Sequence, residues 1–261
     1  MRIGVGRSRV VLGVFTLLLV GALPSGRSTP EAAAKPPASV RIVASLPAGA
    51  PVPAPLRVMP LGASSTEGVG SPATAGYRGP LSELLRHDGV AVDFVGSKRG
   101  GPASLADRDH EGHSGWTIAM LAPRVAAWLR ATRPDVVLLH AGTNDLGAGA
   151  SGAVVAGRLD DLLNRIYTAA PRTHVIVAGV WATMRSRSAA RADLAARTPR
   201  VVARHHTLGH SIDFVDTTHL LSPSDFTDSL HANASGYRKI AAMWDREIEA
   251  YLAARRAAST P

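Results

Sequence analysis

The chain carries three residues whose types, taken together, could perform nucleophilic catalysis: Ser64, Asp228 and His231. A serine hydroxyl is a poor nucleophile at neutral pH and needs a base within hydrogen-bond reach. A histidine can accept that proton and return it to a leaving group, and an aspartate can orient the imidazole and stabilise its charged form. Because Asp228 stands just before His231, one loop can present both side chains. The set predicts acyl transfer through a covalent acyl-serine.

Each of these residues also has a simpler structural explanation. Ser64 follows an apolar run that ends in a turn at Gly62, and a serine at such a position often caps a helix. Asp228 could cap the last helix in the same way, and a single histidine among the ten in the chain is more often structural than catalytic. Ser65 is the alternative nucleophile. The catalytic interpretation therefore requires that loops distant in sequence meet in space.

A further feature, the sequence GTND at residues 142–145, follows the most apolar strand segment of the chain. The tetrahedral intermediate of acyl transfer carries an oxyanion, which preorganised hydrogen-bond donors must stabilise. The side-chain amide of Asn144 and main-chain N–H groups at turns are suitable donors. Alternatively, Asn144 or Asp145 could cap the next helix.

These residues need a scaffold, and strand-like segments alternate with helical ones along the chain. Apolar and β-branched runs predict strands at residues 58–61, 90–95, 135–140, 174–180 and 212–215. Apolar periodicity predicts helices at residues 81–86, 117–130 and 153–170. A poorly periodic, Arg/Ala-rich stretch at 184–209, interrupted by Pro199, and a closing segment at 235–254 are also expected to be helical, with loops at 70–79 and 96–115. This order predicts a single-domain, three-layer α/β/α sandwich around a parallel, doubly wound, flavodoxin-like sheet. In such a fold, ligands bind at the carboxyl edge of the sheet.

The two ends of the chain differ from this pattern. Basic residues followed by an apolar run predict a secretory signal peptide at residues 1–25, with a poorly marked cleavage site, and hence a secreted protein. An uncleaved membrane anchor is the alternative. A Pro/Ala-rich linker is expected at residues 26–55, the folded domain at 56–256 and a short tail at 257–261.

The formal net charge of +9 would suit a nucleic-acid partner, but the basic residues outside the signal segment are scattered and aromatics make up only 5% of the chain. Solvated surface charge explains them better, and no nucleic-acid partner is expected. The absence of cysteine excludes a disulfide framework and a thiolate metal site.

The motifs resemble those of the SGNH (GDSL-type) hydrolases, which are recognised by short sequence blocks. The block usually written G-D-S corresponds to residues 62–64, G-x-N-D to residues 142–145, and D-x-x-H to residues 228–231. The resemblance implies Ser64 as nucleophile, with Asp228 and His231 as its partners. It also implies an oxyanion hole made by the N–H of Ser64, the N–H of Gly115 in HSGWT, and the Asn144 amide.

Within that superfamily, residues 57–244 are similar to carbohydrate esterase family 3, the acetylxylan esterases, most specifically in the segment ending DHEGHSGWTI. This implies removal of small acyl groups, above all O-acetyl groups, from a polysaccharide such as xylan, with no cofactor and no stable membrane partner. The oligomeric state stays open. Two alternatives are a lysophospholipase-like esterase of lipids or short-chain esters, and a non-catalytic glycan-binding protein on an esterase scaffold.

Two substitutions depart from the family pattern. Ala63 replaces the aspartate that usually precedes the nucleophile, so the turn lacks that side chain's hydrogen bonds and Ser64 could be misplaced. Ala232 stands where many relatives have proline. The segment Asp107–His113 (DRDHEGH) contains possible metal ligands, but their spacing is irregular and unlike the helical spacing of a zinc hydrolase. We expect a structural loop that positions Gly115, and no metal.

Overall fold

The structure is a computed structural model of the chain, and it describes residues 54–71, 73, 75–182 and 185–259. The chain divides between Ala50 and Pro51, and the expected signal peptide and almost all of the expected linker lie outside the described residues. Those parts of the sequence interpretation remain predictions. Within the described ranges, no helix combines the length and the apolar character needed to cross a membrane.

A seven-stranded sheet forms the centre of the unit that begins at Pro51, in the order β3-β4-β1-β5-β6-β7, with β2 also paired to β1. Every pairing is parallel except that of β3 with β4. The strands are β1 (Leu56–Gly62), β2 (Val92–Phe94), β3 (Lys98–Arg99), β4 (Asp109–Gly112), β5 (Val136–His140), β6 (His174–Ala178) and β7 (Ile212–Val215).

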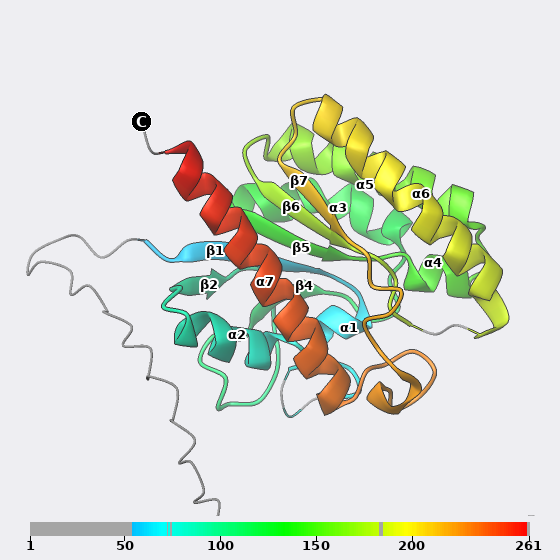
Figure 1. Cartoon of the computed structure of the whole chain (residues 1–261), viewed down its shortest axis with the longest axis horizontal. Coiled ribbons are helices and arrows are strands. Elements are labelled where there is room, and N and C mark those ends of the chain that lie inside the picture. Colours follow the sequence, from blue (N-terminus) through cyan, green and yellow to red (C-terminus); the bar gives the residue numbers. More distant parts are fainter. Residues whose placement is uncertain (1–53, 72, 74, 183–184, 260–261) are drawn as a thin grey trace, which may run out of the picture. The chain divides into compact units, whose positions relative to one another are not determined.

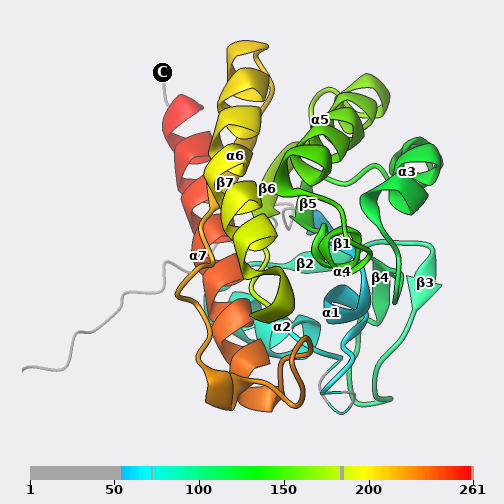
Figure 2. The same ribbon diagram turned by 90° about the vertical axis from the view of Figure 1, so that its right-hand side faces the viewer.

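Helices cover both faces of the sheet (Figures 1 and 2), with α3, α5 and α6 on one side and α2 and α7 on the other. The α-helices are α1 (Ser64–Glu67), α2 (Arg78–His87), α3 (Ile118–Thr132), α4 (Thr143–Gly147), α5 (Gly152–Ala169), α6 (Ser188–Thr207) and α7 (Ala234–Ala258). The short 3-10 helices η2 (Arg185–Arg187) and η3 (Pro223–Asp225) precede α6 and α7.

Strand β5 shows why the sheet is buried on both faces. Val137 and Leu139 pack into the core under α3 and α5, and Val136 and Leu138 pack into the core under α2 and α7. Successive strand residues point to opposite faces, so a strand covered on both sides must be apolar throughout. The predicted three-layer α/β fold is confirmed.

Two details of the prediction are wrong. Residues 96–115 were expected to be a loop but contain β3 and β4, and β3 makes the sheet mixed. The sequence of β4, DHEG, shows no apolar alternation, so the pattern did not indicate a strand. Its buried side chains are polar, and hydrogen bonds to Glu111 and His110 make their burial possible. The second error concerns α6, which continues through Pro199. Contacts of Leu194 and Val202 with the core outweigh the one hydrogen bond that proline cannot donate.

Candidate active site

Ser64 is the first residue of α1, immediately beyond the end of β1. The turn between them closes through main-chain bonds, because the carbonyl oxygen of Ala63 accepts from the N–H groups of Thr66 (3.1 Å) and Glu67 (3.0 Å). Gly62 is required here, since a Cβ at this position would lie 2.3 Å from the carbonyl oxygen of His140. The turn thus forms without the aspartate side chain that Ala63 replaces.

The structure brings the three predicted side chains into one hydrogen-bonded line. Ser64 Oγ lies 3.1 Å from Nε2 of His231, whose Nδ1 lies 2.8 Å from Oδ2 of Asp228. Burial acts to raise the pKa of Asp228, but hydrogen bonds from the imidazole and from two main-chain N–H groups lower it to about 2. An ionised Asp228 accepts the proton on Nδ1, so Nε2 is the nitrogen free to accept from the serine. Ser65, the alternative nucleophile, is buried, and its side chain interacts with the hydroxyl of Tyr237, whose pKa it acts to lower.

The loop that presents His231 is held mainly by local bonds. Thr227 donates to the carbonyl oxygen of His231 through both its N–H (2.9 Å) and its hydroxyl (3.0 Å). Ala232 is buried and forms a β-bridge with Phe226. Gly70 supports the loop from behind, where a Cβ would lie 2.5 Å from the carbonyl oxygen of Ala232. The role of Gly70 was not predicted, because the contact joins residues far apart in the chain.

Asn144 lies beside the serine. Both residues line a small cavity of about 10 Å³, together with Ala63, Ser65, His140, Ala141, Thr143 and Leu230. The Asn144 amide donates to the carbonyl oxygen of Trp116 at 2.8 Å, which fixes its orientation and leaves its second hydrogen for another acceptor. Gly115 does not line this cavity; it occupies the adjoining turn with a φ of +80°.

The two residues that precede Gly115 are anchored by buried or half-buried groups. Glu67 accepts from the N–H of Ser114 at 3.0 Å and forms an ion pair with Lys98 at 2.9 Å. His113, one residue earlier, lies 2.6 Å from the fully buried carboxylate of Glu111. Sequence reasoning missed Glu67 and Glu111, since nothing in their local sequence indicates which loop they contact.

Two further charged side chains hold the elements behind the site. The fully buried guanidinium of Arg78 donates to carbonyl oxygens of Thr66, Glu67, Gly100 and Arg108, which ties α1 to the segment before β4. Asp145 caps α3 rather than the helix that follows it in sequence, because its carboxylate accepts from the N–H of Ile118 at 2.9 Å and pairs with Arg158 at 2.7 Å. Neither role was predicted.

The segment Asp107–His113 turns several of its polar side chains towards its own backbone. Asp107 accepts from the N–H groups of Phe94 (2.5 Å) and Asp109 (3.2 Å), and His110 Nδ1 accepts from the N–H of Gly112 at 3.0 Å. Burial, with the charge of Arg78 nearby, lowers the pKa of His110 to about 3, so this imidazole is neutral. These bonds fit a structural role for the segment.

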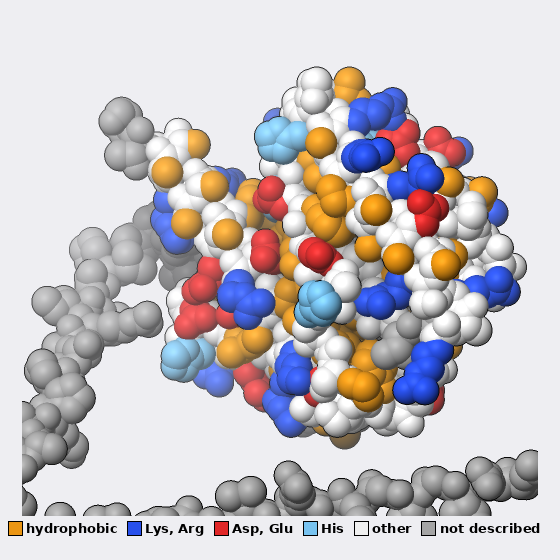
Figure 3. Space-filling view, turned by 45° about the vertical axis from the view of Figure 1, so that its right-hand side comes forward, with side chains coloured by type: hydrophobic (Ala, Val, Ile, Leu, Met, Phe, Trp, Pro, Cys, Tyr) orange, Lys and Arg blue, Asp and Glu red, His pale blue; other side chains and the backbone are white. Residues whose placement is uncertain are grey.

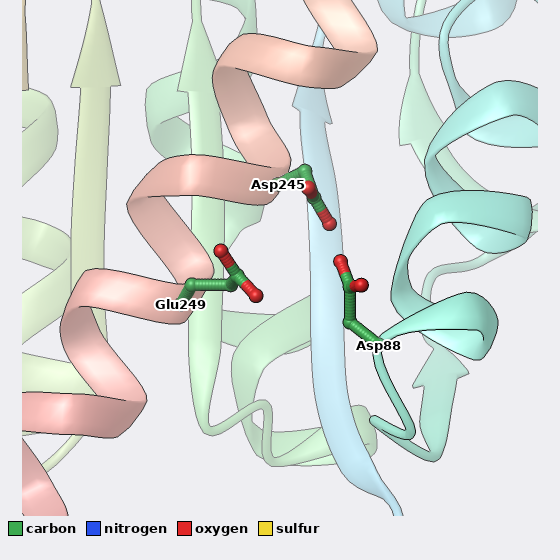
Figure 4. A group of neighbouring side chains, drawn as sticks. All are labelled: Asp88, Asp245 and Glu249. Atoms are coloured by element: carbon green, nitrogen blue, oxygen red, sulfur yellow. The ribbon is translucent and has the colours of Figure 1, made fainter. Parts of the chain in front are cut away.

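Among the described residues, one group of carboxylates elsewhere is close enough to share an ion: Asp88, Asp245 and Glu249, from the end of α2 and from α7 (Figure 4). Burial, together with the neighbouring carboxylates, raises the pKa of Asp245. Protonation of Asp245 would relieve the repulsion without an ion. An acidic cluster of this kind does not by itself define a metal site.

The protein is thus an α/β protein with a largely parallel sheet. At the carboxyl edge of this sheet it carries a hydrogen-bonded serine, histidine and aspartate: Ser64, His231 and Asp228. Residues 61–239 match the model of the GDSL-like Lipase/Acylhydrolase family, and the chain belongs to that family. The resemblance to the SGNH hydrolases is thereby confirmed.

Among individual proteins, the chain is similar to several esterases. A family 3 carbohydrate esterase from Clostridium thermocellum is 36% identical, with a TM-score of 0.67 over 73% of this chain and 94% of that chain. An acetyl esterase mutant solved with an acetate ion is 26% identical, with a TM-score of 0.63 over 75% of this chain and 97% of that one. A multidomain esterase from Ruminococcus flavefaciens is 27% identical over 76% of this chain, and the match spans only 29% of its length.

Proposed function

We propose that this protein is a serine esterase that acts through a covalent acyl-serine. Ser64 Oγ attacks the ester carbonyl while its proton passes to Nε2 of His231, and Asp228 stabilises the resulting imidazolium. The imidazolium then gives this proton to the alkoxide as the ester C–O bond breaks. A water molecule, activated by the same nitrogen, releases the carboxylic acid and restores the serine. The observation that carries the proposal is the unbroken line from Ser64 Oγ to Asp228 Oδ2.

The negative charge of the tetrahedral intermediate would be held by the Asn144 amide and the N–H groups of Ser64 and Gly115. The second amide hydrogen of Asn144 is available for this purpose, and Ser64 and Asn144 line the same cavity. The anchoring of Ser114 by Glu67 and of Trp116 by Asn144 restrains the turn that carries Gly115. Donors that are fixed before the reaction avoid the cost of reorganisation during it.

The preferred substrate is an O-acetyl ester on a polysaccharide such as xylan. The similarity to a family 3 carbohydrate esterase and to an acetyl esterase supports this substrate class. The small cavity beside Ser64, lined partly by Ala63, Ala141 and Leu230, suits a methyl group better than a long acyl chain. Export directed by residues 1–25 would bring the enzyme to such a polymer.

A fluorophosphonate probe with mass-spectrometric mapping tests the nucleophile, and p-nitrophenyl esters of increasing chain length test the substrate. We expect labelling of Ser64, loss of turnover in Ser64→Ala, and the highest kcat/KM with acetate. Labelling of another serine would contradict the mechanism, and a preference for eight carbons or more would favour the lipid esterase. A wild-type protein that binds glycan but hydrolyses none of these esters would favour a non-catalytic role.

A further inference from the structure

A wide groove adjoins the proposed catalytic residues. Its volume is about 700 Å³, and its lining residues include Asp228 and Leu230 from the loop that carries His231. Leu230 also lines the small cavity beside Ser64. The small cavity and the groove therefore meet at this side chain. An ester with its acyl group in the cavity would have its alcohol portion in or near the groove.

Two arginines form one wall of the groove. Arg185 and Arg187 belong to η2, and both are exposed. Neither guanidinium forms an ion pair or hydrogen bond with any other part of the chain that the structure describes. On the right-hand part of the face in Figure 3, Lys and Arg side chains are more common than Asp and Glu side chains. Both cations are thus available to a ligand.

The other charged side chains in and beside the groove already have hydrogen-bond or ion-pair partners within the protein. Asp228 is the only carboxylate among the described lining residues, and both its oxygens accept hydrogen bonds, one from His231 and one from main-chain N–H groups. Asp225 in the adjoining η3 is paired with Lys239 at 2.6 Å. Arg191 in α6 donates to the carbonyl oxygen of Val180 at 2.9 Å. The groove therefore presents more free positive than free negative charge.

We infer that this groove binds a carboxylate-bearing sugar, so that the preferred polymer is an acetylated polysaccharide containing uronic acid. The inference rests on the proposed esterase function. A guanidinium can bind a carboxylate through two parallel hydrogen bonds, which gives orientation as well as attraction. Phe226 and Pro223 in the same groove offer apolar surface to the faces of neighbouring sugar rings. Arg185 and Arg187 are thus specificity-determining residues.

A matched pair of polymers tests this inference. The first is acetylated glucuronoxylan, and the second is the same preparation with its carboxylates converted to amides, which removes the charge but keeps the backbone and the acetyl groups. We expect wild-type kcat/KM to be about tenfold higher on the charged polymer at low salt, and the ratio to shrink at high ionic strength. In the double variant Arg185→Gln/Arg187→Gln the ratio should fall to about one.

Arg165→Gln, which changes an exposed arginine on α5 outside the groove, is the matched control and should keep the wild-type ratio. A wild-type ratio near one, with p-nitrophenyl acetate still hydrolysed, would overturn the inference and leave the esterase proposal intact. If p-nitrophenyl acetate is not hydrolysed, the esterase proposal fails. Calorimetric titration with glucuronoxylan oligosaccharides and their amidated forms then decides the inference, because equal affinities would overturn it and an arginine-dependent preference for the acid would support it.

Discussion

The two sides of the site are built in different ways. On the side of Asn144 and Gly115, the supporting charges are buried: Glu111 and Asp145 have fully buried side chains, and Arg78 is equally inaccessible. On the side of His231, the side chain of Asp228 is 54% exposed, and the bonds that Thr227 and Asp228 make within the loop join residues at most four positions apart. The Asn144 side therefore depends on buried charges whose partners come from distant segments, whereas the His231 side depends mainly on a local turn.

The difference has an energetic cause. A charged group costs several kcal/mol to bury unless each of its hydrogen-bonding atoms finds a partner. Arg78, Glu111 and Asp145 each bond to partners in other segments, and these bonds favour the observed arrangement. Such an arrangement suits donors that must already be in place when charge develops. In the proposed mechanism the imidazole of His231 instead exchanges protons with the serine, the leaving group and water. A half-exposed loop permits this because the charged state of His231 stays partly solvated.

The largest expected effect tests the local turn. Asp228→Asn keeps the shape of the side chain but replaces the ionised acceptor, so the imidazole no longer holds the tautomer that accepts from Ser64. We expect kcat on p-nitrophenyl acetate to fall by about 10⁴, while the free energy of unfolding changes by less than about 1 kcal/mol. Steady-state kinetics and urea denaturation measure the two quantities. A fall in kcat below tenfold would show that the carboxylate is not needed.

The next largest expected effect tests Asn144, the proposed oxyanion donor on the other side of the site. Asn144→Ala removes the proposed oxyanion donor and should lower kcat by about 10²–10³ with little change in KM. The same substitution removes the bond to Trp116, so it should also reduce stability by about 1 kcal/mol. Activity and thermal unfolding should therefore both change here, unlike in Asp228→Asn. A rise in KM alone would assign Asn144 to binding.

A third substitution tests the contribution of a buried charge to stability, without changing a proposed catalytic residue. Arg78→Met removes a buried cation that donates to four carbonyl oxygens, and we expect the free energy of unfolding to fall by about 3 kcal/mol. Arg86→Met, on the exposed side of the same helix, is the matched control and should change it by less than about 0.5 kcal/mol. Urea denaturation measures both variants. Equal stabilities of the two variants would mean that the bonds of Arg78 contribute nothing to stability.

The smallest effect concerns pH. Burial lowers the pKa of His140, which stacks on Trp181, to about 3. Below about pH 6.5 the unfolded chain binds a proton at this histidine and the folded protein does not, so stability falls as pH decreases towards 3. The contribution is about 2 kcal/mol at pH 5 relative to pH 7. His140→Phe keeps the stacking, so its unfolding free energy should depend less on pH; an unchanged slope would disprove the assignment.

The candidate catalytic residues could be found from sequence because each lies in a short contiguous motif. Asp228 and His231 are three positions apart, and their hydrogen bond needs only a turn between them. Ser64 and Asn144 each follow a strand that the apolar pattern predicts. Parallel strands end at the same edge of a sheet, so the order of elements already implies that these motifs share one rim.

The supporting residues could not be found in this way. Glu67 meets the N–H of Ser114, 47 positions along the chain, only because β4 joins the edge of β1. The strand β4 itself was missed since its buried residues are polar and are stabilised by partners in other segments. Sequence alone therefore determined the layers and the chemical groups of the site. The tertiary structure decided which buried charges hold those groups in register, because a buried charge is tolerable only where distant parts of the chain supply its partners.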